Sequence, residues 1–155
     1  MRGPGPDSPL LARDALFPVA SVTKSITATL VMQLVEDGLM QLGDPLQKYI
    51  PEFENSNVGV VTNGKLDLVP LKRPITIQDL LRHTSGITYE HTGDGPVHRM
   101  YREARVSSRK ISNEDHARLI AGMPLVCQPG AAWHYSRSTD ILGRVIAQRL
   151  NEKFK

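Results

Sequence analysis

A serine and a lysine lie three positions apart in the segment FPVASVTKSITATLVMQLVEDGL, residues 17–39. On a helix this spacing puts the Ser21 hydroxyl and the Lys24 amine on one face. Free N–H groups and the positive helix end favour a developing anion at Ser21. That positive end and burial among apolar residues lower the expected pKa of Lys24, so a neutral amine could take the serine proton. Alternatively, Ser21 only caps the helix and Lys24 reaches to water.

The elements that position this pair are predicted mainly as helices. In the first, over residues 21–37, apolar side chains recur every three or four positions and Gly38 is a left-handed stop. The apolar positions are Ile26, Leu30, Val31, Leu34 and Val35. Asp44 is then expected to cap a short helix that begins at Pro45 and ends at Pro51.

A hairpin and a capped helix are predicted next. The dipeptide Asn63-Gly64, between VGVV and KLDLV, favours a tight turn and predicts a hairpin over residues 58–69. Thr76 and Asp79 then have the spacing of a capping box at a helix start.

The remaining chain is predicted as turns, a loop and two further helices. Gly86 is expected to close the capped helix, and residues 88–97 to form a loop. One helix is expected over residues 113–121 and another from about Ser138 onward. The buried side of the last helix is predicted to hold Ile141, Leu142, Val145, Ile146 and Leu150.

Four segments occur in a specific order. FPVASVTK is followed by EDGLMQLGDPLQKYIPEF, then ITIQDLLRHTSGI, then QPGAAWHYSRSTDILGRVI. In this order they resemble the serine β-lactamase and penicillin-binding-protein superfamily. The closest resemblance is to its class C β-lactamase-like esterases, the family VIII carboxylesterases, and it covers residues 14–150.

The resemblance implies roles for three side chains. Ser21 corresponds to the nucleophile that forms the acyl-enzyme, and Lys24 to its general-base partner. Tyr135 begins the family's Y-x-N motif, whose phenol moves a proton between nucleophile and leaving group beside the lysine. The oxyanion hole uses the backbone N–H of the nucleophile, here Ser21, and one from a later strand. The landmark HTSG, residues 83–86, is interpreted as structural, because it ends a helix and turns the chain.

One position near these motifs indicates the substrate class, and one triplet resembles a family motif without being that motif. Lactam-processing members usually carry Asn two places after the tyrosine, where this chain has Arg137. Arginine cannot accept a hydrogen bond, which favours ester over amide substrates and makes Arg137 a candidate substrate contact. The triplet His91-Thr92-Gly93 imitates the family's third motif but precedes Tyr135 in a glycine-rich loop, so it is rejected.

The predicted fold class is an α-rich fragment of the two-domain α/β serine β-lactamase and DD-peptidase-like fold. It has mostly helices, one small hairpin, and a central antiparallel sheet that is largely missing. Residues 1–11 are expected to be a flexible lead-in, and residues 12–155 a partial domain made mainly of the helical region. Without the sheet, an exposed apolar face is expected to allow self-association, and the chain by itself to be a weak catalyst.

Composition excludes several other classes. The chain has 155 residues, 40% hydrophobic and 23% charged, as in ordinary globular proteins. Its net charge of +3 is spread without interleaved aromatics, so no nucleic-acid partner is expected. No apolar run is long enough to span a bilayer, and no signal peptide is recognised. The single cysteine allows no internal disulfide and leaves the compartment open. The histidines lack ligand spacing, so neither metal nor cofactor is expected.

The predicted function is a serine hydrolase that forms an acyl-enzyme on Ser21 with small carboxylic esters. One alternative is a β-lactamase or DD-peptidase acting on penicillin-type or peptidoglycan amides. Another is a non-catalytic binding protein on the same scaffold, since a fold can be kept while its chemistry is lost. The expected partner is therefore a small-molecule ester or lactam.

Overall fold

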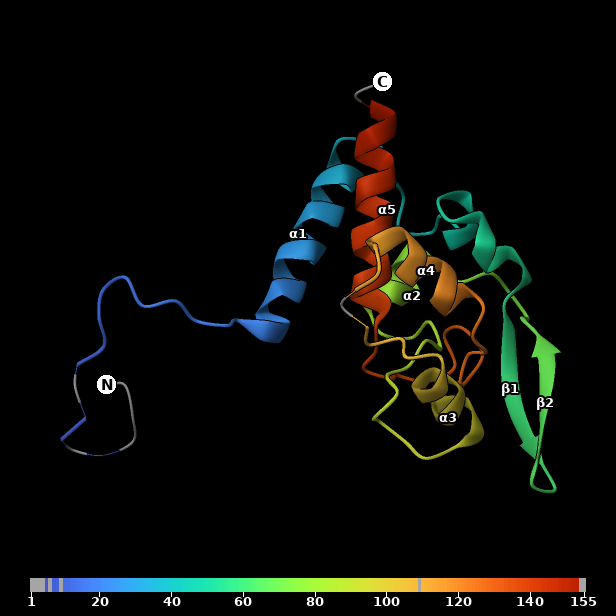
Figure 1. The fold of residues 1–155 in the computed structure, drawn as a ribbon. Helices are drawn as coiled ribbons and strands as arrows, with labels where there is room; N and C mark the ends of the chain where they lie inside the picture. Colours follow the sequence, from blue (N-terminus) through green and yellow to red (C-terminus); the bar gives the residue numbers. More distant parts are fainter. Residues whose placement is uncertain (1–4, 6, 9, 109, 154–155) are drawn as a thin grey trace.

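The computed structural model describes residues 5, 7–8, 10–108 and 110–153. Figure 1 shows α1 and α5 side by side, with the β1–β2 hairpin on the far side of the molecule from α1. In chain order the elements are the 3-10 helix η1 (Ala20–Val22), α1 (Thr23–Glu36), the 3-10 helices η2 (Leu46–Lys48) and η3 (Pro51–Asn55), β1 (Asn57–Thr62), β2 (Lys65–Pro70), α2 (Ile77–Leu81), α3 (Pro96–Glu103), α4 (Asn113–Ala121) and α5 (Ser138–Lys153). The predicted lead-in lies partly outside the described residues.

The helix predicted over residues 21–37 is confirmed as η1 followed by α1. Gly38 has a φ of 68°, and the Leu39 N–H returns to the Leu34 carbonyl, as in a glycine-terminated helix. Only one side of α1 is covered, where it packs on α5. Val31 and Leu34 are buried on that side, whereas Ile26 on the other side is 60% exposed.

The short helix predicted after Asp44 is wrong in its details. Asp44 makes no side-chain cap, because Pro45 occupies the N-cap position of η2. The Asp44 carboxylate instead pairs with Lys48 and accepts hydrogen bonds from the Gln41 N–H and the Tyr49 hydroxyl. Nor does Pro51 end that helix; it opens η3, consistent with the preference of proline for a first helical position.

The predicted hairpin is confirmed by the antiparallel pairing of β1 and β2. Asn63 and Gly64 at its turn both have positive φ, 51° and 77°. The hairpin is tied to the body by its first strand. Gly59 N–H donates to the Leu125 carbonyl, and Leu125 N–H donates to the Asn57 carbonyl.

The capping box at α2 is present, with Thr76 and Asp79 each bonding the other's backbone N–H. The helix ends at Leu81, earlier than predicted, because His83 and not Gly86 makes the first left-handed turn, with φ of 56°. Gly86 makes a second such turn at φ of 84°. A Cβ at Gly86 would overlap the Cys127 carbonyl oxygen. The backbone at Gly86 therefore packs directly against the backbone at Cys127, with no room for a side chain between them.

Helix α3 was not predicted, and it begins inside residues 88–97, which were expected to form a loop. Pro96 starts it, and Val97 and Tyr101, four positions apart, are both buried. Helix α4 matches the predicted bounds, and its Ser112 side chain accepts a hydrogen bond from the Asp115 N–H at 3.0 Å.

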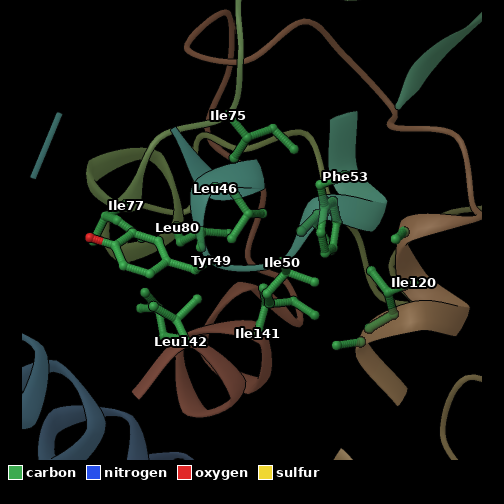
Figure 2. Packing of buried hydrophobic residues seen from close by; sticks show 14 of the residues in the cluster. Leu46, Tyr49, Ile50, Phe53, Ile75, Ile77, Leu80, Ile120, Ile141 and Leu142 are labelled. Atoms are coloured by element: carbon green, nitrogen blue, oxygen red, sulfur yellow. The ribbon is translucent and has the colours of Figure 1, made fainter. Parts of the chain in front are cut away.

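The main core surrounds α5, against which α1, α2 and α4 pack. Figure 2 shows that Ile141 and Leu142 of α5 face side chains from η2, η3, α2 and α4. The residues labelled there are Leu46, Tyr49, Ile50, Phe53, Ile75, Ile77, Leu80, Ile120, Ile141 and Leu142, all in one buried cluster. The predicted apolar face of α5 is buried up to Ile146, whereas Leu150 is 37% exposed.

The described residues thus form the expected α-rich arrangement, with one two-stranded sheet. None of the helices they form is both long and apolar enough to cross a membrane. The start of α1 and the start of α5 lie close together. Ser21 and Tyr135, which are predicted to react, lie just before these two helices.

Candidate active site

Ser21 and Tyr135, which are 114 positions apart, meet in the structure: the Tyr135 hydroxyl donates a hydrogen bond to Ser21 Oγ at 2.7 Å. Ser21 does not cap either helix. The N-cap residues of η1 and α1 are Val19 and Val22, and neither cap has a side-chain hydrogen bond. The serine hydroxyl is therefore directed at the tyrosine and not at the helix backbone.

The backbone at Ser21 is turned sharply. Ala20, directly before it, has a φ of 44°, in the left-handed region that residues with a Cβ rarely adopt. Such strain costs about 1–3 kcal/mol and is often found where a side chain must be aimed. It places Ser21 in the short helix η1, directly before α1.

Lys24 lies beside two tyrosine rings. Its Nζ atom is 5.0 Å from the ring centroid of Tyr135 and 5.9 Å from that of Tyr89. Burial acts to lower the pKa of Lys24, but interactions with the hydroxyls of Tyr135 and Tyr89 outweigh it and raise the pKa above 10.5. The predicted lowering of the lysine pKa is therefore wrong, because its partners are phenols that stabilise the charged ammonium.

The pKa of Tyr135 moves the other way. The hydrogen bond with Ser21 lowers it from 10.0; burial opposes this, and the hydrogen bond and charge of Lys24 lower it further. The pKa values of Lys24 and Tyr135 are therefore shifted in opposite directions, and each shift favours the charged form of its side chain.

The Tyr135 segment is fixed by the HTSG turn after α2. The His134 N–H donates to the His83 carbonyl at 2.8 Å, and the Ser136 N–H donates to His83 Nδ1 at 3.3 Å. The His83 ring lies 4.9 Å from the Tyr135 ring. Burial and the charge of Lys24 lower the pKa of His83, which favours a neutral ring that accepts at Nδ1.

Buried hydroxyls add a second connection between this turn and α5. Ser85 Oγ lies 2.8 Å from Ser138 Oγ, which lies 2.7 Å from Ser136 Oγ. All three serines are 0% exposed, and their hydroxyls bond one another as well as the His83 ring and nearby backbone N–H groups. The HTSG turn therefore ends α2, as predicted, and also positions the segment that carries Tyr135.

Aromatic side chains that sequence reasoning did not assign to the site surround Tyr135. The Tyr89 ring lies 5.6 Å from it, and the Trp133 ring 6.3 Å. Trp133 is 66% exposed, so it is not part of the core. No local pattern marks Tyr89, since it lies in an irregular loop. Only its contact with Lys24 and Tyr135 identifies it.

Arg137 lies next to the site with its guanidinium paired to Glu90. The Arg137 Nη2 atom is 2.9 Å from one Glu90 carboxylate oxygen and 3.0 Å from the other. The contact of Arg137 with a substrate stays a prediction. The triplet at residues 91–93 lies in a loop, as predicted, and not on a strand. In the described part of the chain, no cluster of three or more potential ligand side chains is arranged to hold a metal.

Comparison with known proteins identifies the family of the chain. The sequence profile named Beta-lactamase matches residues 7–155. The chain belongs to the beta-lactamase family. The family resemblance predicted from its four segments is thereby confirmed.

The similar proteins include esterases and acyltransferases. The chain is 38% identical over 149 residues to the acyltransferase calJ of Penicillium decumbens, covering 94% of this chain and 34% of that protein. It is 36% identical over 138 residues to the esterase EstB of Burkholderia gladioli, covering 88% and 33%. The solved structure of EstCE1, a hydrolase with promiscuous acyltransferase activity, matches with a TM-score of 0.65 at 27% identity, covering 84% of this chain and 32% of that one.

The chain spans about a third of the length of the curated relatives it matches. The predicted fold class is therefore confirmed as a helix-rich part of the beta-lactamase-like fold. The family to which it belongs includes proteins named as hydrolases and as acyltransferases.

Proposed function

We propose that this chain carries the nucleophile of a serine hydrolase that forms an acyl-enzyme on Ser21 with small carboxylic esters. The observation that supports it is the 2.7 Å hydrogen bond between the Tyr135 hydroxyl and Ser21 Oγ, next to the Lys24 ammonium. In the reaction, deprotonated Tyr135 takes the Ser21 proton as Oγ attacks the ester carbonyl, and returns it to the departing alkoxide. Lys24 stabilises the phenolate, and the Ser21 N–H donates to the developing oxyanion.

The test is covalent labelling with a fluorophosphonate, applied to this chain and to any longer gene product that contains it. We expect the adduct on Ser21, mapped by peptide mass spectrometry, and its loss in Ser21→Ala. Ser25→Ala, in the adjoining helix α1, is the matched control and should label normally. An adduct on another residue contradicts the assignment, and a folded protein that never labels supports a non-catalytic binding protein.

The substrate class is proposed to be short-chain esters in preference to lactams. Arg137 stands where lactam-processing relatives usually place Asn, and its donors cannot replace the acceptor of an amide side chain. The ester p-nitrophenyl butyrate should therefore be turned over faster than the cephalosporin nitrocefin. Comparable turnover of both would instead support a β-lactamase or a DD-peptidase.

Acyl transfer to an alcohol is a second candidate function. It is favoured by relatives named as acyltransferases, among them calJ, and by the same acyl-enzyme chemistry with an alcohol in place of water. Adding a primary alcohol to the ester assay separates the two reactions. Formation of the new ester, measured by mass spectrometry against free acid, indicates transfer.

A further inference from the structure

Glu90 and Arg137 form a nearly buried ion pair beside the candidate active site. The Arg137 guanidinium uses Nη2 toward both carboxylate oxygens and Nε toward one of them, at 3.3 Å. The two side chains are only 15% and 13% exposed. Such a forked contact fixes the plane of the guanidinium as well as its position. The pair joins the loop after α2 to the residue just before α5.

The same guanidinium lies over the ring of Tyr89, at 5.0 Å from Arg137 Cζ to the ring centroid. Tyr89 precedes Glu90 in the chain, so the ion pair and the stacked ring restrain one short segment. Tyr89 in turn contacts Lys24 and lies 5.6 Å from the Tyr135 ring. A continuous series of contacts therefore runs from Glu90 to the lysine ammonium.

Lys24 needs such a restraint more than its partners do. Lysine has a flexible four-carbon stem and a strongly hydrated charge, so holding it in one place is entropically costly. It projects from α1 near Val22 and Ile26, which are 63% and 60% exposed. The aromatic rings of Tyr89 and Tyr135 are the contacts that hold its ammonium near Ser21.

We propose that the Glu90–Arg137 ion pair is a positioning pair that holds Tyr89 against the ammonium of Lys24, and so keeps that charge beside the Tyr135 hydroxyl. The proposal rests on the proposed roles of Lys24 and Tyr135. It assigns Arg137 to the support of the reacting groups through Tyr89, with its donors directed to Glu90 and not to the substrate.

A measurable consequence is the acidity of Tyr135. The groups that face it are Ser21 and Lys24 from η1 and α1, His83 from the turn after α2, and Tyr89 from the loop. Asp140 of α5 acts to raise its pKa. His83 favours its neutral form, so Lys24 is the charge that stabilises the phenolate. Loosening Tyr89 should therefore raise the pKa of Tyr135 toward the ordinary tyrosine value of about 10.

The experiment is a pH titration of this chain labelled with ¹³C at tyrosine Cζ and followed by NMR. The chain has four tyrosines, and Tyr135→Phe assigns the relevant signal. Arg137→Met and Tyr89→Leu, which removes the aromatic ring, should each raise the Tyr135 pKa, and the double variant should add little to either. Arg137→Lys should raise the Tyr135 pKa as Arg137→Met does, because a lysine ammonium cannot make the forked contact that the guanidinium makes with the carboxylate.

Arg144→Met is the matched control. The Arg144 side chain is 19% exposed and pairs with Glu114 at 2.9 Å. The Arg144→Met variant therefore also removes an ion pair of an arginine, but one that involves α4 and not Tyr89. Its Tyr135 titration should stay unchanged. If Arg137→Met does not fold, the same titration is made with Glu90→Gln, which removes the carboxylate charge but keeps one neutral acceptor. Glu90→Gln should likewise raise the Tyr135 pKa.

An unchanged Tyr135 pKa in the folded variant would overturn the proposal and leave the pair a purely structural contact. A raised KM for esters together with an unchanged titration would also overturn it, in favour of direct substrate contact by Arg137. The titration needs no turnover. A shifted pKa without labelling of Ser21 would thus support the positioning pair while contradicting the proposed hydrolase.

Discussion

At the residue scale, the decisive feature is where protons reside around Ser21. A serine–lysine pair by itself requires a neutral lysine, yet two phenols here raise the pKa of Lys24. The pKa of Tyr135 is lowered instead, by its bond with Ser21 and by Lys24. On this basis we propose that Ser21 transfers its proton to Tyr135 while Lys24 remains a fixed charge.

Tyr135→Phe tests this division of roles. The variant keeps the ring but removes the proton acceptor, so we expect labelling of Ser21 to slow by on the order of a hundred- to ten-thousand-fold. Because Tyr135 must be deprotonated to act, the rate in the unmodified protein should rise with pH through a pKa below 10.0. Tyr101→Phe, which removes a fully buried hydroxyl elsewhere, is the control and should label normally. Normal labelling of Tyr135→Phe would show that Tyr135 is not the base.

At the element scale, the site depends on how α2 begins and how the chain leaves it. Asp79 caps α2, pairs with Arg73 and accepts a hydrogen bond from the Thr84 hydroxyl at 3.0 Å. The turn that follows carries His83 and Gly86, which contact the segments before α5. The start of one short helix is thus coupled to the position of Tyr135.

Asp79→Asn should weaken this coupling in a pH-dependent way. Burial acts to raise the Asp79 pKa, but the bonds from Arg73, Thr76 and Thr84 lower it from 3.8 to about 2. The carboxylate therefore stabilises the fold above pH 4, and this contribution is lost as the pH falls toward 2. It amounts to at most about 2 kcal/mol, since Arg73 is partly exposed.

Urea denaturation at pH 7 and at pH 2.5 measures this contribution. Asp79→Asn should lose about 2 kcal/mol at pH 7 and less at pH 2.5. Asp67→Asn, on the exposed side of β2, should match the unmodified chain at both values. An equal loss at both pH values would indicate that the charge of Asp79 contributes little.

Gly86→Ala tests the backbone crossing at the HTSG turn. Gly86 has a φ of 84°, and a Cβ there would overlap the Cys127 carbonyl oxygen, which is fixed backbone. We expect a loss of more than about 2 kcal/mol in the free energy of unfolding, measured with urea. Gly38→Ala is the matched control, because its φ is 68° but no atom lies within 4 Å of the added Cβ. It should cost about 1 kcal/mol. Equal costs would show that the crossing can relax.

At the scale of the whole molecule, α1 is held on one side only. It packs on α5, and Figure 1 shows no other element of the described chain against its opposite side. Large apolar residues of α1 and of the segment before it are exposed. These residues are Leu16, Phe17, Val19, Val22, Ile26, Leu30 and Met32. Exposed apolar surface, where it is contiguous, marks an interaction site or promotes association.

We therefore expect the 155-residue chain to associate with itself through this face. Light scattering should show a molar mass that rises with concentration, and Val22→Ser with Ile26→Ser should lower it. Val60→Ser with Val61→Ser, on the exposed hairpin, is the control, since those residues are 40% and 53% exposed and lie far from α1. A monomer at all concentrations would contradict the expectation.

The sequence by itself determined the features that depend on neighbouring residues. Asn63-Gly64 fixed the hairpin turn, Thr76 and Asp79 fixed the start of α2, and the apolar spacing of α5 fixed its buried side up to Ile146. The apolar spacing of α1 predicted its buried side only in part, because Val31 and Leu34 are buried whereas Ile26 and Leu30 are exposed. The order of four short segments was enough to identify the family. Each of these features depends on the backbone preference of a few residues or on the spacing of apolar residues along the chain. Each can therefore be predicted without knowledge of the fold.

Only the tertiary structure decided what surrounds the reacting groups. The Ser21–Tyr135 bond joins residues 114 positions apart, and the Glu90–Arg137 pair joins residues 47 apart. The pKa of Lys24 was predicted in the wrong direction, because helix position and burial were considered without the phenols that long-range folding brings to it. Electrostatics acts through space, and a sequence gives only separations along the chain.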